Sequence, residues 1–250
     1  MHAVGTHLLL FGVGVVAGAL NVIAGGGSFL TLPILMFLGL PAGVANGTNR
    51  VGILLQNVGA VWSFRRDRVL DWKALSWAAA PSLPGAILGT WLALIVSDQV
   101  FKRILAILIV TLCMWTLWRD RNVRQAHVDR SSPPHRVWMA LAFFAIGVYG
   151  GFVQAGVGFL ILAVLLANGF ELVRGNAIKV LTVLCFTVLA LVGFAAQDRI
   201  DWWMGLVLGM GNFEGGLLGA HLTVIKGHQW VRIVVTATMI VFAVKLWFFS

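Results

Sequence analysis

The chain is built from apolar segments that follow one another almost without interruption, each near the length of a bilayer crossing. A helix needs about 20 apolar residues to cross the hydrocarbon core of a membrane. Of the 250 residues, 60% are hydrophobic and only 11% are charged, whereas soluble domains carry roughly a quarter charged residues. A soluble globule could not cover its surface with so few charges. The pattern therefore predicts a polytopic membrane protein.

The sequence contains two copies of one unit. Residues 18–118 align with residues 148–248 at a constant offset of 130, apart from a one-residue slip near Asp67. Identical residues are spread over the whole alignment, and they include Gly26 with Gly156, Asn46 with Asn176, Asp71-Trp72 with Asp201-Trp202, Gly89 with Gly219, and Gln99 with Gln229. We therefore divide the chain into a first repeat (1–118), a basic linker (119–136) and a second repeat (137–250).

All of the apolar segments are predicted to be helices, because an isolated strand cannot satisfy its backbone hydrogen bonds in lipid. Each repeat is expected to hold four long helices and one short helix that follows a glycine-rich break. The predicted ranges are 7–24, 28–39, 44–64, 73–96 and 100–118 in the first repeat, and 137–154, 158–169, 174–196, 202–225 and 229–248 in the second. The expected fold class is an all-α polytopic membrane protein with a two-fold internal repeat.

The distribution of basic residues predicts the orientation, because Lys and Arg favour cytoplasmic connectors. With five crossings per repeat and a cytoplasmic linker, thirteen Lys and Arg, Lys179 among them, lie in cytoplasmic connectors and three lie outside. Four crossings per repeat would place six outside. An odd number of crossings inverts the second copy, so we predict an inverted repeat with both termini outside. Whether segments 28–39 and 158–169 cross or re-enter the membrane stays open.

The two glycine-rich breaks are the strongest local signal for a binding site. The first holds Gly25, Gly26, Gly27 and Ser28, and the second holds Gly156 and Gly158. Irregular backbone at membrane depth is tolerated where it is buried in protein or lines a cavity. The short helix after each break offers free N–H groups and the positive end of its dipole, which suits an anion. The alternative is tight helix packing through small residues.

A second group of polar residues opens the helix after each short segment. These residues are Asn46, Thr48, Asn49 and Arg50 in the first repeat, and Asn176 and Lys179 in the second. The amides and the hydroxyl are candidate hydrogen-bond donors to an anion, while Lys179, together with Arg50, would balance its charge. In the alternative interpretation, the two cations extend along their helices to reach the membrane interface.

Glu214 is the only acidic residue inside an apolar segment, and His221 follows it seven residues later. A carboxylate in the membrane is expensive, so it is protonated, paired or functional. Histidine titrates near neutral pH, and the spacing predicts that both side chains share a helix face. Together they are candidates for a proton path. A polar packing contact inside the bundle is the alternative.

Several functional classes are disfavoured by the sequence. It has no phosphate-binding loop, no zinc-binding helix motif and no serine nucleophile elbow, so we expect no enzyme activity, no cofactor and no metal. The net charge of +9 comes from connectors rather than from one soluble face, which argues against nucleic acid as a partner. The expected partners are a small anion and the lipid bilayer, and a homo-oligomer stays open.

The stretch ALNVIAGGGSFLTLPILMFLGLPAGVANGTNRVGILLQN at residues 19–57, with its mate at 151–179, resembles the sulfite exporter TauE/SafE family of membrane permeases. The resemblance covers nearly the whole chain. It implies a duplicated helical bundle in a bacterial-type inner membrane that transports sulfite, sulfonates or related anions. Proton coupling or an anion gradient would drive the transport. The resemblance also supports the residues of both breaks and the Thr48-Asn49 pair as the core of the site. The chain departs from the family pattern around Ile178-Lys179.

Three functional hypotheses follow. The first is a secondary transporter or exporter of small sulfur-containing anions that is coupled to protons. The second is a carrier of another small carboxylate or inorganic anion. The third is a non-transport intramembrane enzyme or assembly subunit, for which the sequence shows no recognisable pair of nucleophile and base.

Overall fold

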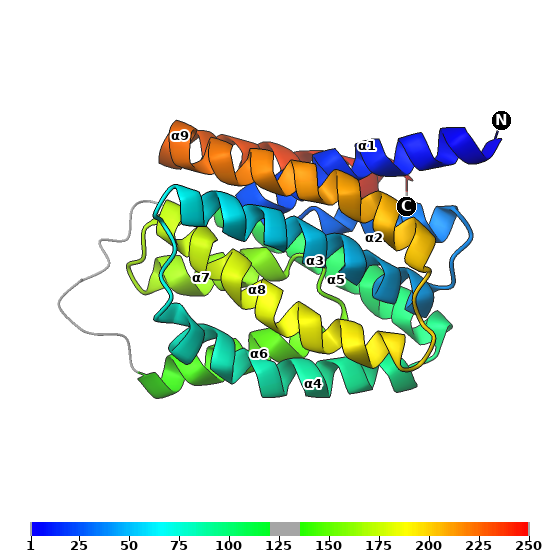
Figure 1. Cartoon of the computed structure of the whole chain (residues 1–250), viewed down its shortest axis with the longest axis horizontal. Coiled ribbons are helices and arrows are strands. Elements are labelled where there is room, and N and C mark those ends of the chain that lie inside the picture. Colours follow the sequence, from blue (N-terminus) through cyan, green and yellow to red (C-terminus); the bar gives the residue numbers. More distant parts are fainter. Residues whose placement is uncertain (1, 121–135, 250) are drawn as a thin grey trace.

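The computed structural model describes residues 2–120 and 136–249, and within these ranges it leaves out the side chains of 2–4, 75, 109–110, 112–120 and 227–249. Every regular element of the described part is helical (Figure 1). The elements are α1 (His2–Ile23), α2 (Ser28–Phe37), α3 (Ala42–Arg66), the π-helical turn η1 (Leu75–Ala79), α4 (Ala80–Ile95), α5 (Asp98–Asp120), α6 (Arg136–Phe152), α7 (Val157–Ala167), α8 (Leu172–Ala195) and α9 (Trp202–Phe249). The predicted all-α fold is confirmed.

The structure has one helical element of 48 residues, α9, where two helices at 202–225 and 229–248 were predicted. A straight helix of this length would extend about 72 Å. In Figure 1, however, α9 begins at the right-hand end and the C terminus lies there too, so the ribbon turns back along itself.

The two short helices turn back into the bundle. A Cβ on Gly27 would lie 2.0 Å from the carbonyl oxygen of Ala17 and 2.7 Å from Cβ of Asn21, so the start of α2 lies against the end of α1. Helices α2 and α7 have 10 and 11 residues, or about 15 and 17 Å, which is too short for a core of about 30 Å. In Figure 1, α2 leads back toward the right-hand end and α7 lies at the left.

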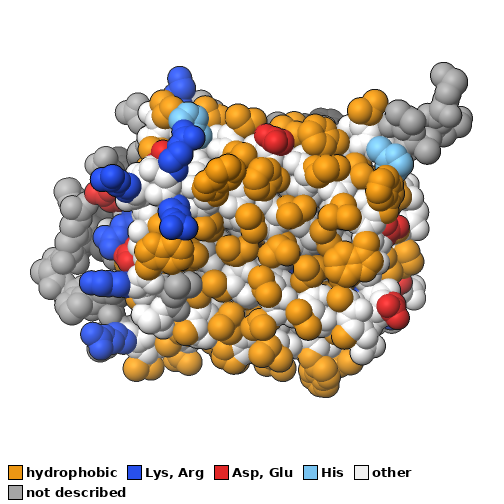
Figure 2. All heavy atoms as spheres, viewed as in Figure 1, with side chains coloured by type: hydrophobic (Ala, Val, Ile, Leu, Met, Phe, Trp, Pro, Cys, Tyr) orange, Lys and Arg blue, Asp and Glu red, His pale blue; other side chains and the backbone are white. Residues whose placement is uncertain are grey.

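The outer surface has the character of a lipid-facing surface. Three helical segments of the described residues are long and apolar enough to cross a membrane, namely Gly5–Ile23, Ser76–Ile95 and Leu172–Ala195. Helix α3 is long, but its polar residues face the interior of the protein. Figure 2 shows hydrophobic side chains over most of one face, with Lys and Arg gathered at its left-hand end.

The two sequence halves interlock through glycines. Helix α1 packs on α9, where a Cβ on Gly215 would lie 2.1 Å from the carbonyl oxygen of Val15. Helix α4 packs on α6 in the same way, because a Cβ on Gly85 would lie 2.2 Å from the carbonyl oxygen of Phe144. Such contacts are possible only without side chains, and small residues are what lets membrane helices approach closely. Each half therefore packs its first helix on a later helix of the other half.

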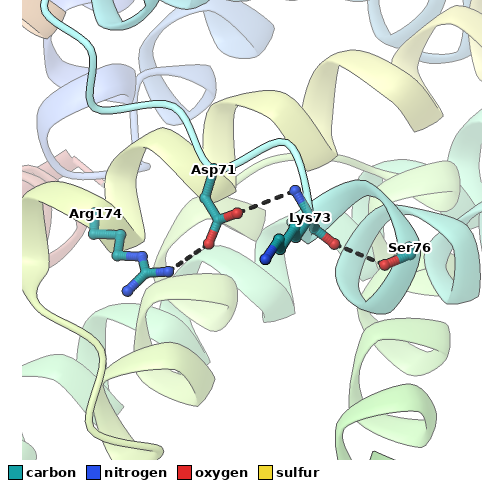
Figure 3. A network of polar contacts seen from close by, with 4 residues as sticks. All are labelled: Asp71, Lys73, Ser76 and Arg174. Atoms are coloured by element: carbon teal, nitrogen blue, oxygen red, sulfur yellow. Dashed lines mark hydrogen bonds and ion pairs between the residues drawn. The ribbon is translucent and has the colours of Figure 1, made fainter.

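An ion pair joins the halves at the end where the basic residues gather. Nη2 of Arg174, in the first turn of α8, lies 2.5 Å from Oδ2 of Asp71 in the connector after α3 (Figure 3). The backbone N–H of Lys73 donates to the other oxygen of Asp71 at 3.0 Å, and the Ser76 hydroxyl donates to the Lys73 carbonyl at 2.7 Å. The hydrogen bond from Arg174 lowers the pKa of the Asp71 carboxyl below its usual value.

Candidate functional site

The two glycine-rich breaks meet in the middle of the protein. A Cβ on Gly25 would lie 2.6 Å from the carbonyl carbon of Gly158, and a Cβ on Gly158 would lie 2.5 Å from Cα of Gly25. A Cβ on Gly26 would lie 2.8 Å from the ring of Phe159, and this ring stacks on Phe29 with centroids 6.4 Å apart. The backbones of the two breaks are therefore in direct contact, although they are far apart in the sequence.

Both breaks use backbone conformations that disfavour most side chains. Gly25 has φ +97° and Gly156 has φ +73°, in the left-handed region that glycine adopts without a steric penalty. Gln154 has φ +60° although it carries a side chain. Such a conformation costs energy and persists only where the surroundings hold it. The side chain of Gln154 is in fact fixed by two hydrogen bonds, which involve Arg50 and Thr187.

Backbone donors are left over at both breaks. The N–H groups of Phe29, Leu30 and Thr31 donate to carbonyls of Gly26 and Gly27. Within the described residues, the N–H groups of Gly26, Gly27 and Ser28 have no protein acceptor, and neither do those of Gly156 and Gly158. These are the orphan donors of two helix N-termini, and all five residues are buried. The arrangement offers donors with partial positive charge to an anion.

Arg50 is fully buried at 0% exposure, so it does not extend to the membrane interface. Its guanidinium group reaches from α3 to the C-terminal end of α6. Its two terminal nitrogens donate to the carbonyl oxygens of Gly150 (3.1 Å), Gly151 (2.5 Å) and Phe152 (3.4 Å) and to Oε1 of Gln154 (3.1 Å). The guanidinium also lies 4.7 Å from the ring centroid of Phe194. Its remaining donor, Nε, is buried without a partner.

Lys179 occupies the corresponding place at the end of α1. It is 2% exposed, and so it is an interior charge rather than one of the connector charges counted for the orientation. Its Nζ donates to the carbonyl oxygens of Asn21 (3.1 Å) and Val22 (2.5 Å) and to Oδ1 of Asn176 (2.6 Å). A protonated lysine has three N–H donors, so the ammonium group of Lys179 is fully used within the protein.

The two cations form a reciprocal pattern between the halves. Arg50 on α3 caps the last carbonyls of α6, and Lys179 on α8 caps those of α1. An amide one turn earlier assists each cation: Asn46 donates to the Phe152 carbonyl at 2.8 Å, and Asn176 donates to the Ile23 carbonyl at 3.4 Å. A cation at a helix C-terminus is stabilised by the helix dipole. The broken helix of each half is therefore held by a charged residue of the other half.

The remaining polar residues of α3 divide into two groups. Asn49 accepts a hydrogen bond from Thr31 of α2 at 2.6 Å, and its Nδ2 is buried without a partner. Oδ1 of Asn46 also lacks a partner. Thr48, by contrast, accepts the backbone N–H of Asp201 at 2.9 Å, so it joins α3 to the start of α9. The structure therefore places Asn46 and Asn49 near the breaks and assigns Thr48 a different contact.

The electrostatic character of the interior is positive. Among the residues whose burial is described, Arg50 and Lys179 are the only charged side chains that are buried, and no buried carboxylate balances them. Gln154 and Thr187 also belong to the polar interior, where Nε2 of Gln154 donates to the Thr187 hydroxyl at 2.5 Å. The sequence signal for Gln154 was its position at the start of the second break. Thr187 lies inside an apolar helix, and no feature of the sequence marked it as part of the site.

Glu214 and His221 lie away from the breaks. Both side chains are exposed, and they share the outward face of α9 with Leu218 and Ile225. The opposite face carries the glycines that pack on α1 and α3, since a Cβ on Gly216 would lie 2.4 Å from the carbonyl oxygen of Gln56. The shared face was expected from the spacing of seven. The structure does not bring either residue to the interior site, and so it provides no interior proton path through them.

No cluster of three or more His, Cys, Asp or Glu side chains that could hold a metal ion occurs in the part of the chain that the structure describes. The candidate site therefore consists of glycine backbone, amides and two buried cations.

Comparison with known proteins identifies related membrane transporters. The chain is 28% identical to a probable membrane transporter protein of Haemophilus influenzae over 95% of this chain and 93% of the relative. It is 29% identical to one from Sinorhizobium, over 98% and 95%, and 28% identical to the probable membrane transporter YfcA of Escherichia coli, over 95% and 88%. No solved structure matches. The family model for the sulfite exporter TauE/SafE matches residues 10–246. The chain therefore belongs to the TauE/SafE family of membrane transporters, which are permeases rather than enzymes.

Proposed function

We propose that this membrane transporter is a secondary transporter of small sulfur-containing oxyanions such as sulfite or sulfonates. The observation that carries the proposal is the pair of buried cations, Arg50 and Lys179, with no buried carboxylate among the described residues to balance them. An uncompensated buried charge is costly. A site that keeps two of them beside broken helices is suited to an anion that supplies the missing negative charge.

The substrate would bind where the two breaks meet. The unpaired N–H groups of the two short helices, Nδ2 of Asn49 and Nε of Arg50 are donors without protein acceptors. They come from α2, α3 and α7 and so from several directions, as an oxyanion with three or four oxygens requires. Lys179 would act through its charge rather than by direct contact, because its three donors are used. Asn46 and Asn176 would hold the helix ends in place.

We further propose that the two repeats are inverted and that the protein is a multi-pass protein of a bacterial-type inner membrane. In each half a re-entrant pair of helices would precede three full crossings. In the second half these would be α8 and the two arms of α9, which turns back along itself, so the number of crossings would stay odd. The cytoplasmic face would be the end that gathers the Lys and Arg side chains (Figure 2). Inverted repeats with broken helices at their interface are the arrangement that transporters use for alternating access.

The test is flux into proteoliposomes that contain only this protein. Labelled sulfite would be offered under an imposed pH gradient, with methanesulfonate, sulfate and acetate as unlabelled competitors. Saturable sulfite uptake that methanesulfonate inhibits and acetate does not would support the proposal. Strong inhibition by acetate would favour a carrier of small carboxylates, whereas inhibition by sulfate, itself a sulfur oxyanion, would agree with the proposal. Absence of flux for every anion would contradict transport by this chain alone.

The matched variants are Arg50→Gln and Arg65→Gln. Both remove one positive charge, but Arg50 is buried at the breaks whereas Arg65 is exposed at the end of α3. Loss of the unpaired Nε donor and of the charge should lower sulfite flux at least tenfold in Arg50→Gln, since hydrogen bonds to charged groups contribute about 1.5–3 kcal/mol. Arg65→Gln should retain the flux of the wild type. Equal flux in both variants would exclude Arg50 from the site.

A further inference from the structure

Among the residues with described burial, one interior group can both carry and release a positive charge. Arginine keeps its proton in proteins, whereas the ammonium group of a lysine can release it. Of the other interior groups, Tyr149 donates its hydroxyl proton to the Ala155 carbonyl at 2.5 Å, and Cys185 is a free, partly buried thiol. Both are neutral when protonated and would become anions beside an anionic substrate. No buried carboxylate or histidine occurs among the residues with described burial.

We infer that Nζ of Lys179 carries the proton that moves together with the transported anion, whereas Glu214 and His221 do not. The inference rests on the proposed function. It follows from the position of Lys179 at the meeting point of the breaks, where a Cβ on Gly158 would lie 3.1 Å from Cδ of Lys179. Glu214 and His221 are exposed on the outward face of α9.

No charged side chain faces the ammonium group in the described surroundings. Helix α1 presents the carbonyls of Asn21 and Val22, and α8 itself presents Oδ1 of Asn176. On the side of α7, the backbone of Gly158 lies against the side chain of Lys179. The neighbours of Lys179 along α8, Ala177 and Val180, pack in an apolar cluster with residues of α1, α3 and α9. An entering anion would therefore be the counter-charge of Lys179.

The protonation state of Lys179 is coupled to the structure of the first break. The ammonium group satisfies three acceptors at 3.1, 2.5 and 2.6 Å, whereas the neutral amine has only two N–H groups to donate. Loss of the proton leaves one acceptor at the end of α1 unpaired, and a buried acceptor without a partner costs about 1–3 kcal/mol. The proton enters from water on the side where the anion binds and leaves to water on the opposite side. One proton then accompanies each anion.

The experiment measures protons and anions together. Proteoliposomes loaded with the pH dye pyranine would take up labelled sulfite, so that the ratio of protons to anions is obtained independently of the rate. The wild type should move about one proton more per anion than Lys179→Arg, whose side chain keeps its charge. Arg50→Gln changes the other break without adding a group that can titrate, and it should keep the wild-type ratio even where its rate falls. Glu214→Gln should also keep the ratio.

Three results would overturn the inference. Lys179→Arg could move as many protons per anion as the wild type, Glu214→Gln could move fewer protons per anion than the wild type, or the wild type could transport sulfite without moving protons. A wild type that moves no anion at all would instead contradict the proposed function. Arginine is larger than lysine and Gly158 leaves it little space, so titration calorimetry of the wild type provides a second measurement. Methanesulfonate, which does not titrate near neutral pH, is added in two buffers of different ionisation enthalpy. Proton uptake on binding is expected as the pH is raised and Lys179 starts without its proton, and absence of uptake at every pH would contradict the inference without any variant.

Discussion

At the scale of single residues, glycines allow the backbones of the two halves to approach closely. Gly25 and Gly158 come from opposite halves of the chain, and each occupies the space in which a side chain of the other would lie. The sequence indicated that both breaks are special, and it left open whether they serve packing or binding. The structure shows that the glycines do pack tightly. The unpaired N–H groups beside them are a separate feature, so the two interpretations are compatible.

Gly158→Ala should therefore destabilise the junction of the breaks. The new Cβ would lie 2.5 Å from Cα of Gly25, which is backbone that cannot rotate away. Overpacking of this kind costs about 1–3 kcal/mol, so the midpoint of thermal unfolding in detergent should fall by several degrees. Gly12→Ala is the matched control, because a Cβ there would meet nothing within 4 Å. If the two variants unfolded at the same temperature, the close contact between the two breaks would not contribute to stability.

The capping amide Asn176 allows a second prediction at this scale. Asn176→Ala removes the donor to the Ile23 carbonyl and the acceptor for Nζ of Lys179. It leaves buried polar groups unsatisfied, at a cost of about 1–3 kcal/mol. Thermal unfolding should show the loss. Asn168→Ala is a useful comparison, since Asn168 is partly buried and bonds only within its own turn, to the Val164 carbonyl. A larger loss in Asn168→Ala would contradict the capping role of Asn176.

At the scale of elements, the sequence predicted helices and their approximate ends, because hydrophobic length and glycine position are local properties. It did not predict the partners of Arg50 and Lys179. A lysine or arginine near the start of a helix can extend its side chain to the membrane interface or into the core. Only the positions of α1 and α6 decide between these alternatives. Since α6 lies in the other half of the chain, this contact cannot be predicted from local pattern. The outward position of Glu214 was also undetermined, because the packing face of α9 depends on α1 and α3.

The ion pair between Asp71 and Arg174 fastens the connector after α3 to α8 (Figure 3). Because the pKa of Asp71 is lowered in the folded protein, its contribution to stability is present above the unfolded value of about 3.9. The contribution is lost as the pH falls through the folded value. Arg174 is 56% exposed, so the contribution should be small, within the range of about 0–1 kcal/mol for exposed pairs.

Asp71→Asn should therefore lower the unfolding midpoint at pH 7 by about 2 °C, and the difference from the wild type should close below about pH 4. Thermal unfolding over a series of pH values measures both effects. Arg174→Ala should give a similar decrease, and the double variant should add little to either single one. Strict additivity of the two substitutions would show that the pair does not contribute to stability.

At the scale of the whole molecule, the halves hold each other. The first helix of each half packs on a later helix of the other, and each broken helix is capped by a cation from the opposite half. Composition alone predicted the membrane environment, and the offset of 130 predicted two equivalent units. Neither predicted that the units interlock. Movement of α3 or α8 would therefore displace a break in the other half, and this coupling would serve the alternating access that we propose.

The proposed inverted arrangement makes a prediction about the chain termini. Both termini lie at the right-hand end in Figure 1, opposite the end of the basic side chains in Figure 2. If the basic end is cytoplasmic, alkaline phosphatase fused after Ser250 should be active in a bacterial host, and green fluorescent protein at the same place should be dark. Fusions within residues 121–135 should give the opposite result.

The outcomes of this fusion experiment separate the orientation from the symmetry. Suppose that the phosphatase is active in the linker and the fluorescent protein is bright at the C terminus. The orientation is then the reverse of the proposed one. The number of crossings between the linker and the C terminus is still odd, so the repeats remain inverted. If the linker and the C terminus report the same side, that number is even and the repeats are parallel. Parallel repeats would place the two re-entrant pairs on the same side of the membrane. The reciprocal capping of α1 by Lys179 and of α6 by Arg50 would then be impossible, because it requires the pairs to enter from opposite ends and meet.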